Sequence, residues 1–77
     1  MENPVIKVLR QTGCSVLQLA AIADIDVSRI YQIQRGAASR ISPRVLAALA
    51  RLGADPDQVQ QEYLEWRQQL AEPLTVR

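Results

Sequence analysis

The stretch ADIDVSRIYQIQRG, residues 23–36, contains the signals of a short helix with two different faces. Asp26 is a favourable N-cap residue, and Gly36 is the residue type that most often ends a helix in a left-handed conformation. At 100° per residue, Ile30 and Ile33 fall on one side of such a helix. The residues on the other side are Ser28, Gln32 and Arg35. The stretch therefore predicts a helix that packs on a core and turns a polar row toward solvent or another molecule.

Similar helix signals recur along the whole chain. The start signals are Asn3 before Pro4, the capping box of Ser15 and Gln18, Asp26, Ser42 before Pro43, and Asp55 before Pro56. The stop signals are Gly13, Asp24, Gly36, Gly53 and Pro73. No segment alternates like a strand. The sequence thus predicts an all-α chain of five helices forming one domain over residues 1–77, with a last helix over about 56–71.

Composition argues against catalysis and against a metal site. The chain has 77 residues, one cysteine and no histidine, so neither a His/Cys zinc site nor a histidine-based triad can be assembled. No glycine-rich phosphate loop is present. We therefore expect no enzyme activity, no metal and no cofactor. The lack of a signal-peptide pattern and of a long apolar run predicts a cytoplasmic protein without a membrane partner.

A formal net charge of +1 conceals two segments of opposite charge. The charged residues from Val27 to Ala54 are all arginines: Arg29, Arg35, Arg40, Arg44 and Arg51. Acids dominate from Asp55 to Glu72, where Arg67 is the only base. An acid-free run of arginines beside a polar helix face favours a polyanionic partner.

The run from Ser15 to Gly36 resembles the helix-turn-helix of the lambda-repressor-like family, also called Cro/phage-repressor or XRE-type. That family's pattern is S-Q-x-x-L-A-x-x-h-G-h-S-x-x-x-I-x-x-h-E-x-G, where h is apolar. The residues that match without a gap are Ser15, Leu19, Ala20, Ala23, Ile25, Ile30, Ile33 and Gly36. Val16, Asp24 and Asp26 replace the usual Gln, Gly and Ser or Thr. The resemblance extends from Asn3 to about Val59 and implies a compact five-helix domain with its helix-turn-helix core at about 15–36.

This resemblance implies a recognition helix over about 27–35 in the major groove of double-stranded DNA. The base-reading positions would be Val27, Ser28 and Gln32. The Gln32 amide has a chemical reason to be there, because it can pair bidentately with adenine, whereas Val27 either meets a thymine methyl group or turns inward. The candidates for flanking or phosphate contacts are Arg29, Tyr31, Arg35, Arg40, Ser42 at the start of the fourth helix, and Arg44. The plain alternative is that these polar residues form an ordinary solvated face.

The last helix carries an apolar stripe at Val59, Tyr63, Trp66 and Leu70, spaced 4, 3 and 4 residues apart as in a short coiled coil. The stripe either closes the domain's own core or forms a two-fold dimer contact. We expect Val59 and Tyr63 to serve the core and Trp66 and Leu70 to reach a partner, with Tyr63 also counted in the candidate dimer interface. A homodimer would place two recognition helices about one DNA turn, ~34 Å, apart.

The sequence therefore favours a DNA-binding transcription regulator of bacterial or phage origin, which acts as a repressor. It would be cytoplasmic and nucleoid-associated, and it would bind a palindromic operator as a homodimer. The alternative is a protein-interaction module, an antitoxin or adaptor, that uses the same fold and a protein partner bound through the acidic C-terminal helix. The departures at Val16, Asp24 and Asp26 favour this alternative.

Overall fold

Five α-helices make up the computed structural model, which describes residues 1–75 and side chains up to Ala71. Their bounds are α1 Pro4–Thr12, α2 Val16–Ala23, α3 Val27–Arg35, α4 Pro43–Arg51 and α5 Pro56–Thr75. The described residues include no strand, which confirms the all-α class. No single described helix combines the length and the apolar character of a membrane span; α1 and α2 reach them only jointly, as a pair bent by 102°.

Side-chain caps fix where the helices begin. Asn3 Oδ1 accepts the Val5 N–H at 2.9 Å. The capping box is complete, since Ser15 Oγ accepts the Gln18 N–H and Gln18 Oε1 accepts the Ser15 N–H. The remaining caps are Asp26 on α3, Ser42 on α4 and Asp55 on α5. Each cap satisfies backbone N–H groups that have no partner within their helix, and these predicted start signals are confirmed.

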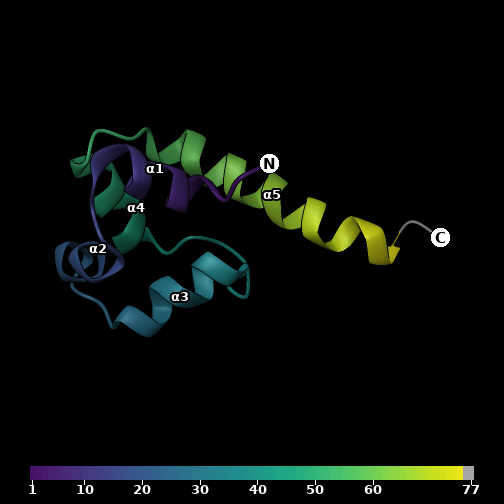
Figure 1. Ribbon diagram of the computed structural model, residues 1–77, viewed down its shortest axis with the longest axis horizontal. Helices are drawn as coiled ribbons and strands as arrows, with labels where there is room; N and C mark the ends of the chain where they lie inside the picture. The colour runs from purple at the N-terminus through teal and green to yellow at the C-terminus, as the bar shows by residue number, and fades with distance from the viewer. Residues whose placement is uncertain (76–77) are drawn as a thin grey trace.

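The predicted stop signals before α5 are also present. Gly13 and Gly36 end α1 and α3 in the left-handed conformation, at φ +72° and +79°. Asp24 adopts the same conformation at φ +56° and ends α2, which an aspartate tolerates better than most residues. The result is a sharp turn over 24–26 that sets α3 at an angle to α2 (Figure 1).

The core receives residues from all five helices. Its fully buried members are Val5, Leu19, Ile30, Ile41, Val45, Leu49 and Tyr63. α2 packs on α3 and α4, and α5 packs on α1 and α4. Cys14 is half-buried and packs against the edge of this cluster. The core therefore holds α3 by its isoleucines and leaves its opposite side free.

The second half of α5 projects beyond the other helices (Figure 1), and the described chain measures 41 × 22 × 20 Å. The prediction that Pro73 ends this helix is wrong, because α5 continues to Thr75. A proline keeps a helical φ, but it removes one backbone hydrogen bond and its ring crowds the carbonyl four residues earlier, so it destabilises a helix without making one impossible. α5 is consequently longer than the sequence predicted.

Candidate nucleic-acid interface

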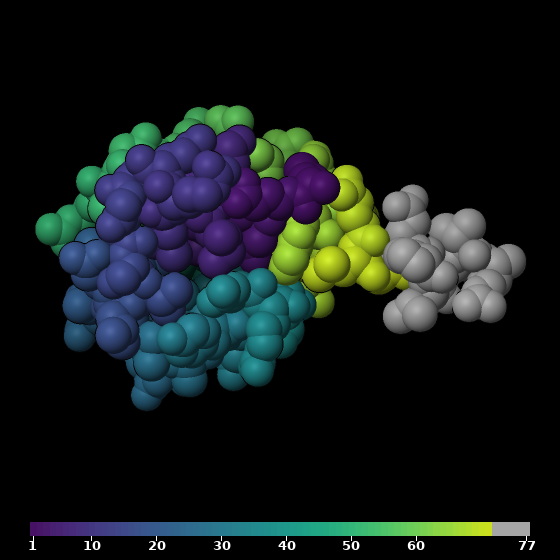
Figure 2. All heavy atoms as spheres, in the orientation of Figure 1, coloured from purple at the N-terminus to yellow at the C-terminus, as the bar shows by residue number. Residues whose placement is uncertain are grey.

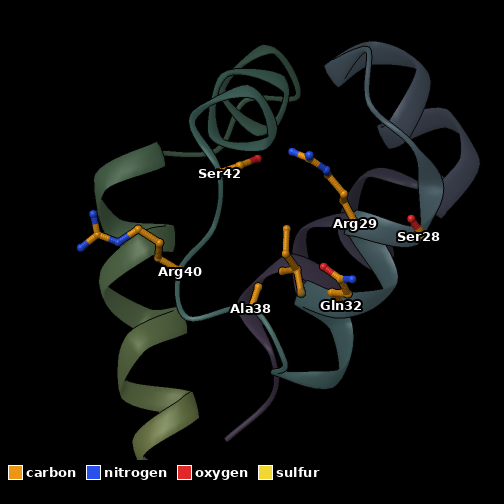
Figure 3. A pocket seen from close by; sticks show the side chains of 7 residues that line it. Ser28, Arg29, Gln32, Ala38, Arg40 and Ser42 are labelled. Carbon is orange, nitrogen blue, oxygen red and sulfur yellow. The ribbon is translucent and has the colours of Figure 1, made fainter.

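A groove of about 380 Å³ lies between α3 and the segment that leads into α4 (Figure 3). α3 forms one wall, and residues 38–42 form the other. The lining residues are Ser28, Arg29, Gln32, Ile33, Ala38, Arg40 and Ser42. Five of the predicted site residues thus meet here, three from α3 and two from the segment leading into α4. The charged lining residues are both arginines, so the groove suits an anionic ligand.

α3 has the two faces that its sequence predicted. Ile30 and Ile33 are buried at 0% and 3% exposure, whereas Ser28 and Gln32 are exposed. Val27 is partly buried and packs against the core. Of its two predicted orientations, it adopts mainly the inward one. The polar row at Ser28 and Gln32 is consequently presented on a helix whose other side is anchored.

Arg29 reaches across the groove, and Arg40 does not. In Figure 3 the Arg29 guanidinium points from α3 toward Ser42, at the N-terminus of α4. Arg40 lines the groove from the other wall, but its guanidinium points away from α3. An anion held by Arg29 would also meet the N-terminus of α4, where helix N–H groups and the helix dipole favour negative charge.

Arg29 stands where a basic residue does not stabilise a helix. Asp26 is the N-cap of α3, so Arg29 occupies the third helical position, near the positive end of the helix dipole. The Asp26 carboxylate accepts the Ser28 N–H at 2.8 Å. Its hydrogen bonds with Ser28, together with the nearby positive charge of Arg29, lower the pKa of the Asp26 carboxyl group. Arg29 is therefore unfavourably placed toward the helix dipole, although its charge interacts favourably with the Asp26 carboxylate.

Arg44 lies in a different place from the other predicted phosphate contacts. Its Nη1 donates to the Asp24 carbonyl oxygen at 2.9 Å and lies 3.8 Å from the Asp24 carboxylate. It lines a second hollow together with Asp24, Ile25, Asp26 and Arg29. Arg44 thus ties α4 to the turn before α3, while its side chain stays 66% exposed. Tyr31 and Arg35 are exposed on α3 but do not line the groove.

The stripe on α5 lies largely against its own domain. Tyr63 has 0% exposure, so its place in the candidate dimer interface is wrong, and it belongs to the core as Val59 does. Trp66 is half-buried, and its ring centroid lies 5.7 Å from that of Tyr63. Trp66 and Leu70 both approach Gly36 at the end of α3, although Leu70 stays 52% exposed. The end of α5 therefore touches the end of the helix that forms the groove.

The N-terminal residues complete this junction. Asn3 Nδ2 donates to the Ile33 carbonyl at 3.1 Å and to the Gln34 carbonyl at 3.2 Å. Figure 2 shows the N-terminal residues, in purple, against α5 and beside the teal segment of α3. Two of the last carbonyls of α3 are thereby bonded by a residue that is itself the cap of α1. The sequence indicated only the local role of Asn3.

Tyr63→Phe is expected to destabilise the domain by about 1 kcal/mol, because the Tyr63 hydroxyl donates to the Ala38 carbonyl at 2.7 Å. Burial raises the pKa of Tyr63 above its ordinary value of 10.0, against the opposing charge of Arg67. A raised folded-state pKa contributes stability that is complete below pH 10 and lost as the pH rises through the folded value. Urea unfolding at about pH 8 and about pH 11 should therefore show a smaller difference between parent and variant at the higher pH. A difference independent of pH would contradict this role.

Among the residues that the structure describes, no group of three or more His, Cys, Asp or Glu side chains could hold a metal ion. The chemistry of the groove is that of two arginines, hydroxyl and amide groups, and one helix N-terminus.

Comparison with known proteins gives no family model that matches this chain, and no curated protein or solved structure matches it at a significant level.

Proposed function

We propose that the chain is a sequence-specific regulator that binds double-stranded DNA through a helix-turn-helix of the lambda-repressor-like type. α2, the turn over 24–26 and α3 are the proposed helix-turn-helix. The observation that carries this proposal is the groove itself, in which the exposed polar row of α3 adjoins Arg29 and the N-terminus of α4. A helix anchored on one side and lined by arginine on the other suits a major groove flanked by phosphates.

The side chains divide into two kinds of contact. Gln32 and Ser28 read base edges, with the exposed part of Val27 beside a thymine methyl group. Arg29 and the N-terminus of α4 hold one phosphate group between them. Ser42 belongs to this shared phosphate site, because it is the N-cap of α4. The outer phosphate contacts are made by Arg40, Arg35 and Tyr31, and Arg44 adds positive charge beside Asp24. This division predicts which substitutions change specificity and which change affinity alone.

The proposed active form is a homodimer that pairs the projecting part of α5. Leu70 is 52% exposed there, and half-buried Trp66 lies one turn before it on the same face of the helix. To match a palindromic operator, the two-fold axis of this dimer has to place two copies of α3 about one DNA turn apart. Occupation of such an operator by the dimer would act as repression.

Selection of binding sites from random DNA duplexes tests the proposal. We expect a consensus with two-fold symmetry, because the same patch on each copy reads one half-site. Binding should weaken steeply with added salt, since each neutralised phosphate contributes roughly −0.9 to the slope of log affinity against log salt. If neither random nor selected duplexes bind at low salt, the proposal is wrong.

Gln32→Ala should relax the consensus at one position in each half-site and lower discrimination there by about 1–3 kcal/mol. The matched control is Gln34→Ala, the same change at an exposed position on α3 outside the groove. Repeating the site selection with both variants measures the effect. An unchanged consensus with Gln32→Ala would show that this amide does not read a base.

A protein-interaction module, an antitoxin or adaptor, is the second candidate. The observation in its favour is at the turn before α3, where the Asp24 side chain is 97% exposed and Arg44 is already bonded to Asp24. A carboxylate beside the proposed phosphate contacts weakens DNA binding and suits a basic protein surface. The salt-dependent DNA titration separates the two candidates.

A further inference from the structure

The loop after α3 is held in place by side chains of α5. Residues 36–41 begin with Gly36, Ala37, Ala38 and Ser39, whose small side chains provide little packing of their own. Fixing a backbone without regular hydrogen bonds costs about 1–2 kcal/mol per residue, so such a loop needs external partners. The side chains that donate hydrogen bonds to its carbonyl groups come from α5.

Two α5 side chains bracket Arg40 in this loop. Arg67 donates through Nε to the Gly36 carbonyl at 3.0 Å and through Nη1 to the Ser39 carbonyl at 3.3 Å. Gln60 accepts the Ile41 N–H at 3.0 Å and donates to the Ile41 carbonyl at 2.9 Å. The peptide groups just before and just after Arg40 are therefore both fixed from α5.

We propose that Gln60 and Arg67 are positioning residues for the DNA groove, which act by setting the place of Arg40 although neither lines the groove. This inference rests on the proposed function, because the contact that they set is the one between Arg40 and a phosphate. The planar fork of Arg67 presents Nε and Nη1 to two carbonyl groups in a fixed geometry, which the compact ammonium group of a lysine does not reproduce. The ends of the Gln60 amide match one N–H and one C=O, which no apolar side chain reproduces.

The test is a double-mutant cycle against Arg40→Ala, measured as affinity for the selected duplex over a range of salt concentrations. Arg67→Lys and Gln60→Met should each lower the affinity about fivefold and make the salt slope shallower by roughly 0.9, as Arg40→Ala does. In the Arg40→Ala background, the same two changes should have almost no further effect. Arg51→Lys, which also keeps its charge and lies on α4 outside the groove, should change neither quantity.

Two results would overturn the inference. If Arg67→Lys and Gln60→Met weaken binding equally in both backgrounds, they do not act through Arg40. If the parent chain binds no duplex at low salt, the proposed function fails, and amide hydrogen exchange at Ile41 then decides on the positioning role alone. Exchange there should accelerate about tenfold or more in both variants but not in Arg51→Lys. Unchanged exchange means that α5 does not order the loop.

Discussion

We expect the Gly36→Ala variant to be about 3 kcal/mol less stable than the parent chain, because two costs coincide at this residue. Gly36 has φ +79°, a conformation that costs an alanine about 1–2 kcal/mol. A Cβ atom there would also lie 2.9 Å from Leu70 Cδ1 and 3.0 Å from Trp66 Cζ3. Leu70 can turn away, but the rigid, half-buried indole of Trp66 must also move by a few tenths of an ångström.

Gly13→Ala is the matched control for this prediction. Gly13 ends α1 with φ +72°, and a Cβ atom added there meets nothing within 4 Å. We expect it to cost about 1 kcal/mol, from backbone strain alone. Urea unfolding followed by circular dichroism, and by the fluorescence of the single tryptophan, measures both variants. Equal losses would mean that the end of α5 does not rest on α3.

Features that depend on neighbouring residues could be predicted from the sequence, whereas features that depend on tertiary context could not. The helix starts were predictable because each cap depends on a few neighbouring residues, as in the Ser15 and Gln18 pair. The left-handed turn at Asp24 follows from the same kind of local rule. The end of α5 was not predictable in this way, because Pro73 only lowers the stability of a helix and does not forbid it.

The candidate site was predictable only in part. Helical periodicity alone placed Ser28 and Gln32 opposite the core, as the structure has them. Periodicity cannot tell that Arg44 bonds to Asp24, a residue 20 positions earlier, or that Arg40 points away from α3. The hydrogen bonds of Gln60 and Arg67 to the backbone on either side of Arg40 likewise join distant segments. Such contacts depend on how the helices pack, which one sequence pattern does not encode.

Arg29→Glu should weaken specific and non-specific DNA binding alike, by about 100-fold or more, while leaving the domain folded. Reversing the charge that faces the N-terminus of α4 puts a carboxylate where a phosphate is proposed to bind, and such repulsion costs several kcal/mol, or about 100-fold or more in affinity. The same change suits the helix, because a glutamate three residues after the N-cap Asp26 completes a capping pattern and interacts favourably with the helix dipole.

This opposition between folding and binding makes the variant informative. Arg51→Glu reverses another exposed charge, at the far end of α4 and outside the groove, and controls for the change in net charge. Thermal unfolding should place Arg29→Glu at or above the parent midpoint, while fluorescence anisotropy with the selected duplex shows a loss at least tenfold greater than that of Arg51→Glu. If both reversals weaken binding equally, the DNA affinity depends only on the net charge of the protein. The groove between α3 and α4 is then not the phosphate site. If Arg29→Glu binds DNA as the parent does, the nucleic-acid interface lies on another face.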